Sequence, residues 1–82
     1  MDPAAELGRL RWRCRRGMKE LDLLLVRWLD RRYATASPAR RATFGRLLEA
    51  QDPQLVGWLL KGERPPDGEL QELVDELLAL PV

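Results

Sequence analysis

Residues 9–22, RLRWRCRRGMKELD, hold six cationic side chains, two carboxylates and one tryptophan. Leu7, Leu10 and Cys14 recur at helical spacings and predict the buried side of a helix. Trp12 would then lie about 200° from Leu10 around that helix and be partly exposed. Because tryptophan and arginine dominate the energetics of protein interfaces, the chemistry that these residues favour is recognition of a partner surface. The alternative, that Trp12 packs against the last helix or the N-terminal turn, stays open.

A short motif inside this segment, Arg16-Gly17 followed by Glu20, has two explanations. Helix capping alone would select an arginine at the end of one helix, a left-handed glycine after it and a glutamate in the first turn of the next. A docking surface would use the same groups as contacts. Met18, at the bend, is either a gap-filler or a projecting contact. The residues alone leave these alternatives open.

Catalytic chemistry has few candidate residues in this chain. There is no histidine and a single cysteine, Cys14, which excludes histidine-based acid/base catalysis and a zinc site with about four Cys or His ligands. None of the six glycines forms a phosphate-binding pattern. Glu20 and Asp22 point about 200° apart on a helix, so they cannot share a proton. We therefore predict that the protein is not an enzyme and has no metal site.

Cysteine usage and the N-terminal residues indicate a cytoplasmic protein. A lone thiol cannot form an internal disulfide, which fits a reducing compartment. The first residues, MDPAAE, lack the charged and apolar regions of a signal peptide. The longest apolar runs, Leu23–Val26 and Leu77–Val82, are far shorter than the ~20 residues that span a bilayer, so no membrane insertion is expected.

The net charge of +1 conceals an uneven distribution along the chain. Residues 1–46 hold 12 Lys or Arg and 5 Asp or Glu, whereas residues 47–82 hold 2 and 8. The basic half suggests an acidic partner surface or a nucleic acid, but the acidic half would repel a polyanion that wrapped the whole domain. The charges therefore favour a protein partner, and no nucleic acid is expected.

Helices must position these residues, because apolar side chains recur every three or four positions. No stretch shows the regular alternation of apolar and polar residues that is typical of a β-strand. In the central helix, Met18–Tyr33, the extra apolar residues Leu23 and Val26 indicate coverage by helices on two sides. We predict an all-α fold, a compact bundle of about five short helices forming a single domain over residues 1–82. The boundaries expected from capping residues, prolines and glycines are Asp2-Pro3 to Gly17, Met18–Tyr33, a start at Ser37-Pro38, Asp52-Pro53 to Gly62, and Asp67 to Pro81.

Several spaced motifs are shared with a known family. They are RRGMKELD at residues 15–22, Leu24-Leu25, Tyr33, Phe44, LLE at residues 47–49, DPxL at residues 52–55 and Trp58-Leu59. Over roughly residues 9–66 the chain resembles the SdhE (YgfY) family of succinate dehydrogenase flavinylation factors. The RGxxE core is weak by itself, but the later motifs at the right distances make the resemblance specific.

The resemblance implies a small helical assembly factor that works on another protein. Such a factor binds the flavoprotein subunit of succinate dehydrogenase, and often of fumarate reductase. It promotes covalent attachment of FAD to a histidine of that subunit, without supplying the bonding chemistry or stably binding a cofactor of its own.

The resemblance also implies which residues meet the partner. The family's RGxxE motif corresponds to Arg16, Gly17 and Glu20. Exposed cations and one glutamate at a rigid bend would complement the client and hold its domains so that its own histidine faces the flavin ring. The flanking residues Arg15, Met18, Lys19 and Asp22 complete this surface, and Trp12 and Arg9, on the helix leading in, are its expected neighbours.

Two other functions stay open at this point. Members of the family are described as partners of a small membrane protein, so an antitoxin-like role is an alternative. A basic nucleic-acid-binding module, acting through the Arg/Trp segment, is a weaker one and would show a steep loss of affinity with salt.

Overall fold

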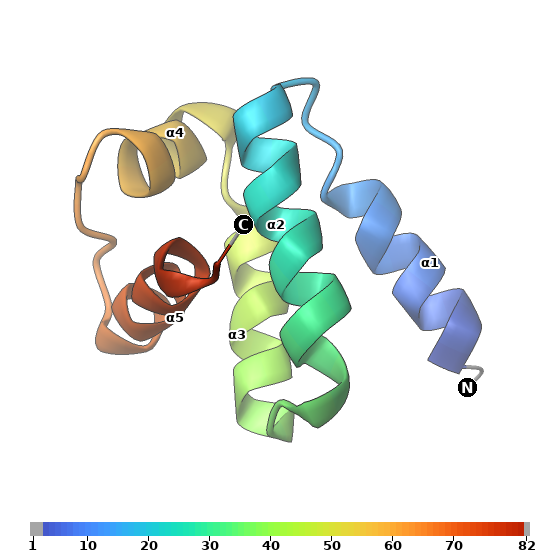
Figure 1. The fold of residues 1–82 in the computed structure, drawn as a ribbon. Helices are drawn as coiled ribbons and strands as arrows, with labels where there is room; N and C mark the ends of the chain where they lie inside the picture. The colour runs from blue at the N-terminus through green and yellow to red at the C-terminus, as the bar shows by residue number, and fades with distance from the viewer. Residues whose placement is uncertain (1–2, 82) are drawn as a thin grey trace.

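The computed structural model describes residues 3–81, which form helices joined by short loops (Figure 1). This part of the chain holds five α-helices, one 3₁₀ turn and no strand, which confirms the predicted all-α fold. In chain order the elements are α1 (Pro3–Arg13), α2 (Lys19–Arg32), the 3₁₀ turn Tyr33–Thr35, α3 (Pro38–Glu49), α4 (Asp52–Leu60) and α5 (Gly68–Ala79).

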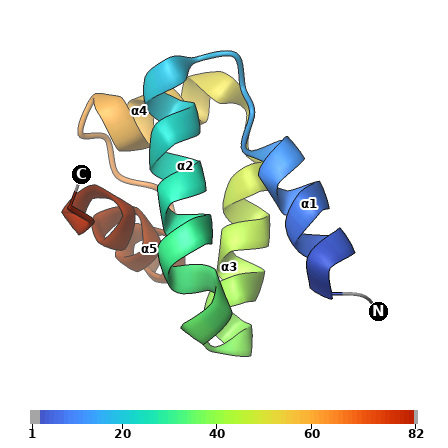
Figure 2. The ribbon, with the colours of Figure 1, turned by 45° about the vertical axis from the view of Figure 1, so that its right-hand side comes forward.

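Helix α2 is the centre of the arrangement. In both Figure 1 and Figure 2, α1 lies on one side of it and α5 on the other. Its buried residues Leu21, Leu25, Trp28 and Leu29 follow the predicted helical spacing. Trp28 stacks on Phe44 of α3, with ring centroids 4.5 Å apart, so the centre of the core joins α2 to α3.

Two of the predicted helix caps are present and one is displaced. The side chains of Ser37 and Asp67 each accept the backbone N–H three residues later, at 3.1 and 2.8 Å. The predicted Asp52 cap is wrong by one residue, because Gln51 holds the N-cap position and its N–H donates to Gln54 Oε1 at 3.0 Å. The following proline then lies within the first helical turn, where its missing N–H costs no intrahelical hydrogen bond.

The first helix ends at Arg13, earlier than the predicted end next to Gly17. The last i→i−4 bond joins the Cys14 N–H to Leu10 O at 3.0 Å. Cys14 is fully buried and anchors the linker against the core, so the chain turns toward α2 beyond it. Gly17 has the expected left-handed conformation, with φ of +76°, but it lies within this linker. The predicted Asp2 cap lies outside the described residues.

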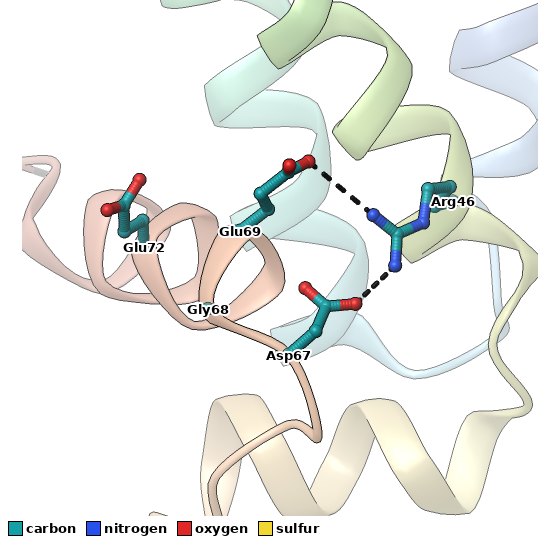
Figure 3. Close-up of a pocket in the computed structure, with 5 residues that line it drawn as sticks. All are labelled: Arg46, Asp67, Gly68, Glu69 and Glu72. Atoms are coloured by element: carbon teal, nitrogen blue, oxygen red, sulfur yellow. Dashed lines mark hydrogen bonds and ion pairs between the residues drawn. The ribbon is translucent and has the colours of Figure 1, made fainter.

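Oppositely charged side chains connect α3 to α5. Arg46 pairs with Asp67 and, at 3.6 Å, with Glu69 (Figure 3). Arg40 pairs with Glu72 at 3.2 Å. The basic and acidic halves of the sequence are therefore in contact along this helix pair, and their charges partly neutralise each other. The cations of α1 and of the linker lie outside this pairing.

The Asp67 cap should make the stability of the protein sensitive to acid. Its carboxylate accepts the Leu70 N–H and pairs with Arg46, which holds its pKa below the usual value of 3.8. The pKa of Asp67 is lower in the folded protein than in the unfolded chain. The hydrogen bond and the ion pair therefore stabilise the fold above the unfolded pKa, and this stability is lost as the pH falls through the folded pKa.

In Asp67→Asn, which keeps a neutral capping oxygen, the free energy of unfolding should fall less between about pH 5 and about pH 3 than it does in the wild type. Urea unfolding followed by circular dichroism at the two pH values measures this difference. An equal fall in both proteins would show that Asp67 does not contribute to the acid sensitivity.

Candidate functional site

The predicted docking residues meet at the corner between α1 and α2, at the top of the view in Figure 1. The backbone turns at Gly17, whose left-handed conformation favours glycine. The Asp22 carboxylate accepts the Arg16 N–H at 2.8 Å, and the Asp22 N–H donates to Met18 O at 2.9 Å. Asp22 therefore holds the linker on both sides of the glycine and makes the corner rigid.

The Arg16 side chain points into the protein. Its guanidinium donates to Leu48 O, to Ala50 O at 3.2 Å and to the Asp52 carboxylate at 3.3 Å, while Nε donates to Arg13 O at 3.1 Å. Only 16% of the side chain is exposed. The expectation of an exposed cation here is wrong, because the last carbonyls of α3 lack helical partners and the guanidinium supplies donors for them.

The other motif residues surround the corner on its outer side. Met18, at the bend, is 37% exposed, so part of its side chain is available for a contact. Glu20 extends from the first turn of α2. The exposed residues of the motif and its flanks are Arg15, Gly17, Met18, Lys19 and Glu20, and Asp22 is half-buried. A partner can therefore reach most of this set directly.

Trp12 lies beside the corner on α1 and is 71% exposed. The predicted exposure is confirmed, and the alternative of packing against the last helix or the N-terminal turn is wrong. The Arg15 guanidinium lies 6.0 Å from the centroid of the indole ring, at the limit of a cation–π contact. Arg9 and Arg13, both exposed, border a shallow hollow next to the ring. The tryptophan is therefore an aromatic contact surrounded by arginines.

A shallow groove lies between the linker and α2, and Leu23 and Val26 form its apolar side. The predicted coverage of the central helix on two sides is confirmed, because α1 and α5 lie on opposite sides of it (Figure 1). Leu23 nevertheless stays 51% exposed and Val26 is half-buried. Periodicity identifies apolar positions, but the neighbouring helices decide which faces become covered. Neither residue is in the predicted docking set, although their position outside the main apolar stripe of α2 is a signal that they border the corner. The remaining lining residues are Arg15, Gly17, Lys19 and Asp22.

The thiol of Cys14 belongs to the hydrophobic core and is unreactive at neutral pH. Its side chain is fully buried, and burial raises its pKa to about 11. It is therefore protonated at neutral pH and a poor nucleophile. Within residues 3–81 no cluster of three or more Cys, Asp or Glu side chains could hold a metal ion. None of the described helices has the length and apolar character needed to cross a membrane.

The fold and the site together define a small helical protein whose prominent surface is suited to binding another molecule. Comparison with known sequences identifies the group: the family described as "Flavinator of succinate dehydrogenase" matches residues 8–81. The chain belongs to this family of assembly factors.

Individual relatives agree with this assignment. The chain is 47% identical over 81 residues to the "FAD assembly factor SdhE" of Xylella fastidiosa (strain 9a5c), covering 99% of this chain and 84% of that protein. It is 39% identical over 67 residues to the protein of the same name from Pectobacterium atrosepticum, covering 82% of this chain and 76% of that protein. With the Xylella relative, the similarity spans the corner as well as the core.

Replacing Arg16 by alanine should destabilise the fold. Arg16→Ala leaves the carbonyls of Leu48 and Ala50 without their donor, which costs about 1–3 kcal/mol of the free energy of unfolding. Arg15→Ala, the matched change at the exposed neighbour, should stay within about 0.5 kcal/mol of the wild type. Urea unfolding of the two variants measures the difference. Equal stabilities would show that the Arg16 contacts do not stabilise the fold.

Cys14 should react slowly with a thiol reagent in the native protein, because it is both buried and protonated. The same reagent should label the chain rapidly in concentrated urea, which serves as the control. Rapid stoichiometric labelling under native conditions would contradict the burial of this side chain.

Proposed function

We propose that this chain is an assembly factor that docks on the flavoprotein subunit of succinate dehydrogenase, and on that of fumarate reductase, and promotes covalent attachment of FAD to a histidine of the subunit. The observation that carries the proposal is membership of the flavinator family over residues 8–81. The relatives from Xylella and Pectobacterium bear the name FAD assembly factor. The exposed corner between α1 and α2 supports the same role.

The corner is suited to positioning a client. Glu20 and Lys19 are exposed at the start of α2, while Asp22 and Arg16 hold the backbone beneath them. A surface that is already rigid loses little conformational entropy when it binds. Docking would hold the client so that its own histidine faces the flavin, and orientation of this kind lowers the barrier to bond formation. FAD belongs to the client in this scheme and is not held stably by the factor.

Charge pairing between α3 and α5 and the state of the single cysteine favour a protein partner in the cytoplasm. Arg40 and Arg46 already pair with carboxylates of α5, which removes them from the cations that a nucleic acid would need. The buried free thiol of Cys14 is compatible with a reducing compartment.

Co-purification of the chain with the flavoprotein subunit, followed by in-gel flavin fluorescence of that subunit, tests the proposal. We expect a 1:1 complex and more covalent flavin in the presence of this protein when FAD is limiting. Equal flavinylation with and without the chain would overturn the proposal. Recovery of a small membrane protein in place of the flavoprotein would support the antitoxin-like alternative.

Charge reversal at Glu20 should impair the client without unfolding the factor. Glu20→Lys removes an exposed carboxylate from the docking surface, and we expect covalent flavin on the client to fall by about tenfold or more. Glu72→Lys, the same change at an exposed position of α5, is the matched control and should retain most activity. Circular dichroism checks that both variants fold. Equal flavinylation by the two variants would show that Glu20 is not part of the docking surface.

A further inference from the structure

We propose that the groove formed by Leu23 and Val26 is the apolar centre of the docking surface and receives an apolar side chain of the flavoprotein subunit that lies next to a carboxylate. This inference rests on the proposed function and adds to it the place and the chemistry of the contact. Leu23 and Val26 do not belong to the RGxxE motif or to its flanking residues.

The first argument is the geometry of α2. Lys19, Asp22, Leu23 and Val26 are spaced i, i+3, i+4 and i+7, so they share one face of the helix. The linker contributes Arg15 and Gly17 to the lining of the groove. The groove is therefore continuous with the corner, and four of its six lining residues are ones that the family motif and its flanks assign to the partner surface.

The second argument is the distribution of burial. Leu23 remains 51% exposed although Leu21 and Leu25 on the same helix are fully buried. A single exposed leucine is ordinary on a protein surface, but this one lies in a groove beside a half-buried valine. Protein interfaces typically combine an apolar centre with a polar rim, and their strongest contacts lie at that centre. The Leu23 side chain is placed to act as such a centre.

The third argument is the charge of the rim. Arg15 and Lys19 are exposed at the edge of the groove, whereas the Asp22 carboxylate accepts the Arg16 N–H and is half-buried. The rim is therefore predominantly cationic. Charge complementarity specifies a carboxylate on the partner next to the apolar side chain that enters the groove.

The variant Leu23→Gln tests the apolar contact. Glutamine has nearly the helix propensity of leucine, but its polar side chain gains much less from contact with an apolar surface. Leu78→Gln is the matched control: Leu78 is 49% exposed on α5, which lies on the other side of α2 from α1 (Figure 1). Binding to the purified flavoprotein subunit is measured by titration calorimetry, with thermal melts of both variants. We expect about tenfold weaker binding for Leu23→Gln and an unchanged affinity for Leu78→Gln.

A second pair of variants tests the carboxylate. Lys19→Gln should slow association with the flavoprotein subunit at low salt and reduce the dependence of the rate on salt, whereas Lys61→Gln, at the other lysine of the chain, should leave both nearly unchanged. Equal rates for the two variants would overturn the acidic character assigned to the partner.

The outcomes separate this inference from the function on which it rests. If the wild-type chain fails to bind the flavoprotein subunit, the proposed function and the groove assignment are both overturned. If the wild type binds and Leu23→Gln binds as tightly as Leu78→Gln, only the groove assignment is overturned. If the free wild-type chain is a dimer and Leu23→Gln is a monomer, the occupant is a second copy and the assignment to the client is wrong.

Discussion

The Arg16 guanidinium is the contact on which the geometry of the corner depends. It reaches from the α1–α2 linker to the carbonyl groups that end α3 and to Asp52 at the start of α4. One planar cation with five donors can satisfy several acceptors that converge from different elements, which a lysine ammonium cannot match in geometry. The linker, the end of α3 and the start of α4 are thereby held together at one point.

This arrangement divides the RGxxE motif into two roles. Arg16 faces inward and stabilises the corner, and Gly17 permits the left-handed turn that redirects the chain. Glu20 and the neighbouring Lys19 face outward on a helix whose start is fixed by Asp22. The helix capping that the sequence suggests at this motif is therefore relocated, because α1 ends at Arg13 and Arg16 caps the end of α3 instead. Glu20, in contrast, stays exposed and available to a partner.

The sequence contains enough information for the element order and for most of the core. Helical spacing identifies Leu21, Leu25 and Trp28 as buried, and the Ser37 and Asp67 caps lie where prolines and local hydrogen bonding predict them. The motif spacing also points to the α1–α2 corner as the candidate site. These features depend on residues within a few positions of each other, so local patterns are sufficient to find them.

The folded structure decided three features that local patterns do not contain. The inward direction of Arg16 depends on the end of α3, more than thirty residues away along the chain. The exposure of Leu23 depends on which faces of α2 receive a neighbouring helix, and the neutralisation of Arg46 depends on α5 lying beside α3. By itself the sequence determined the helices, their apolar faces and the charged motif at the corner. Only the packing of distant segments decided which of these charges and apolar groups remain available to a partner, because availability depends on what covers a side chain and not on its type.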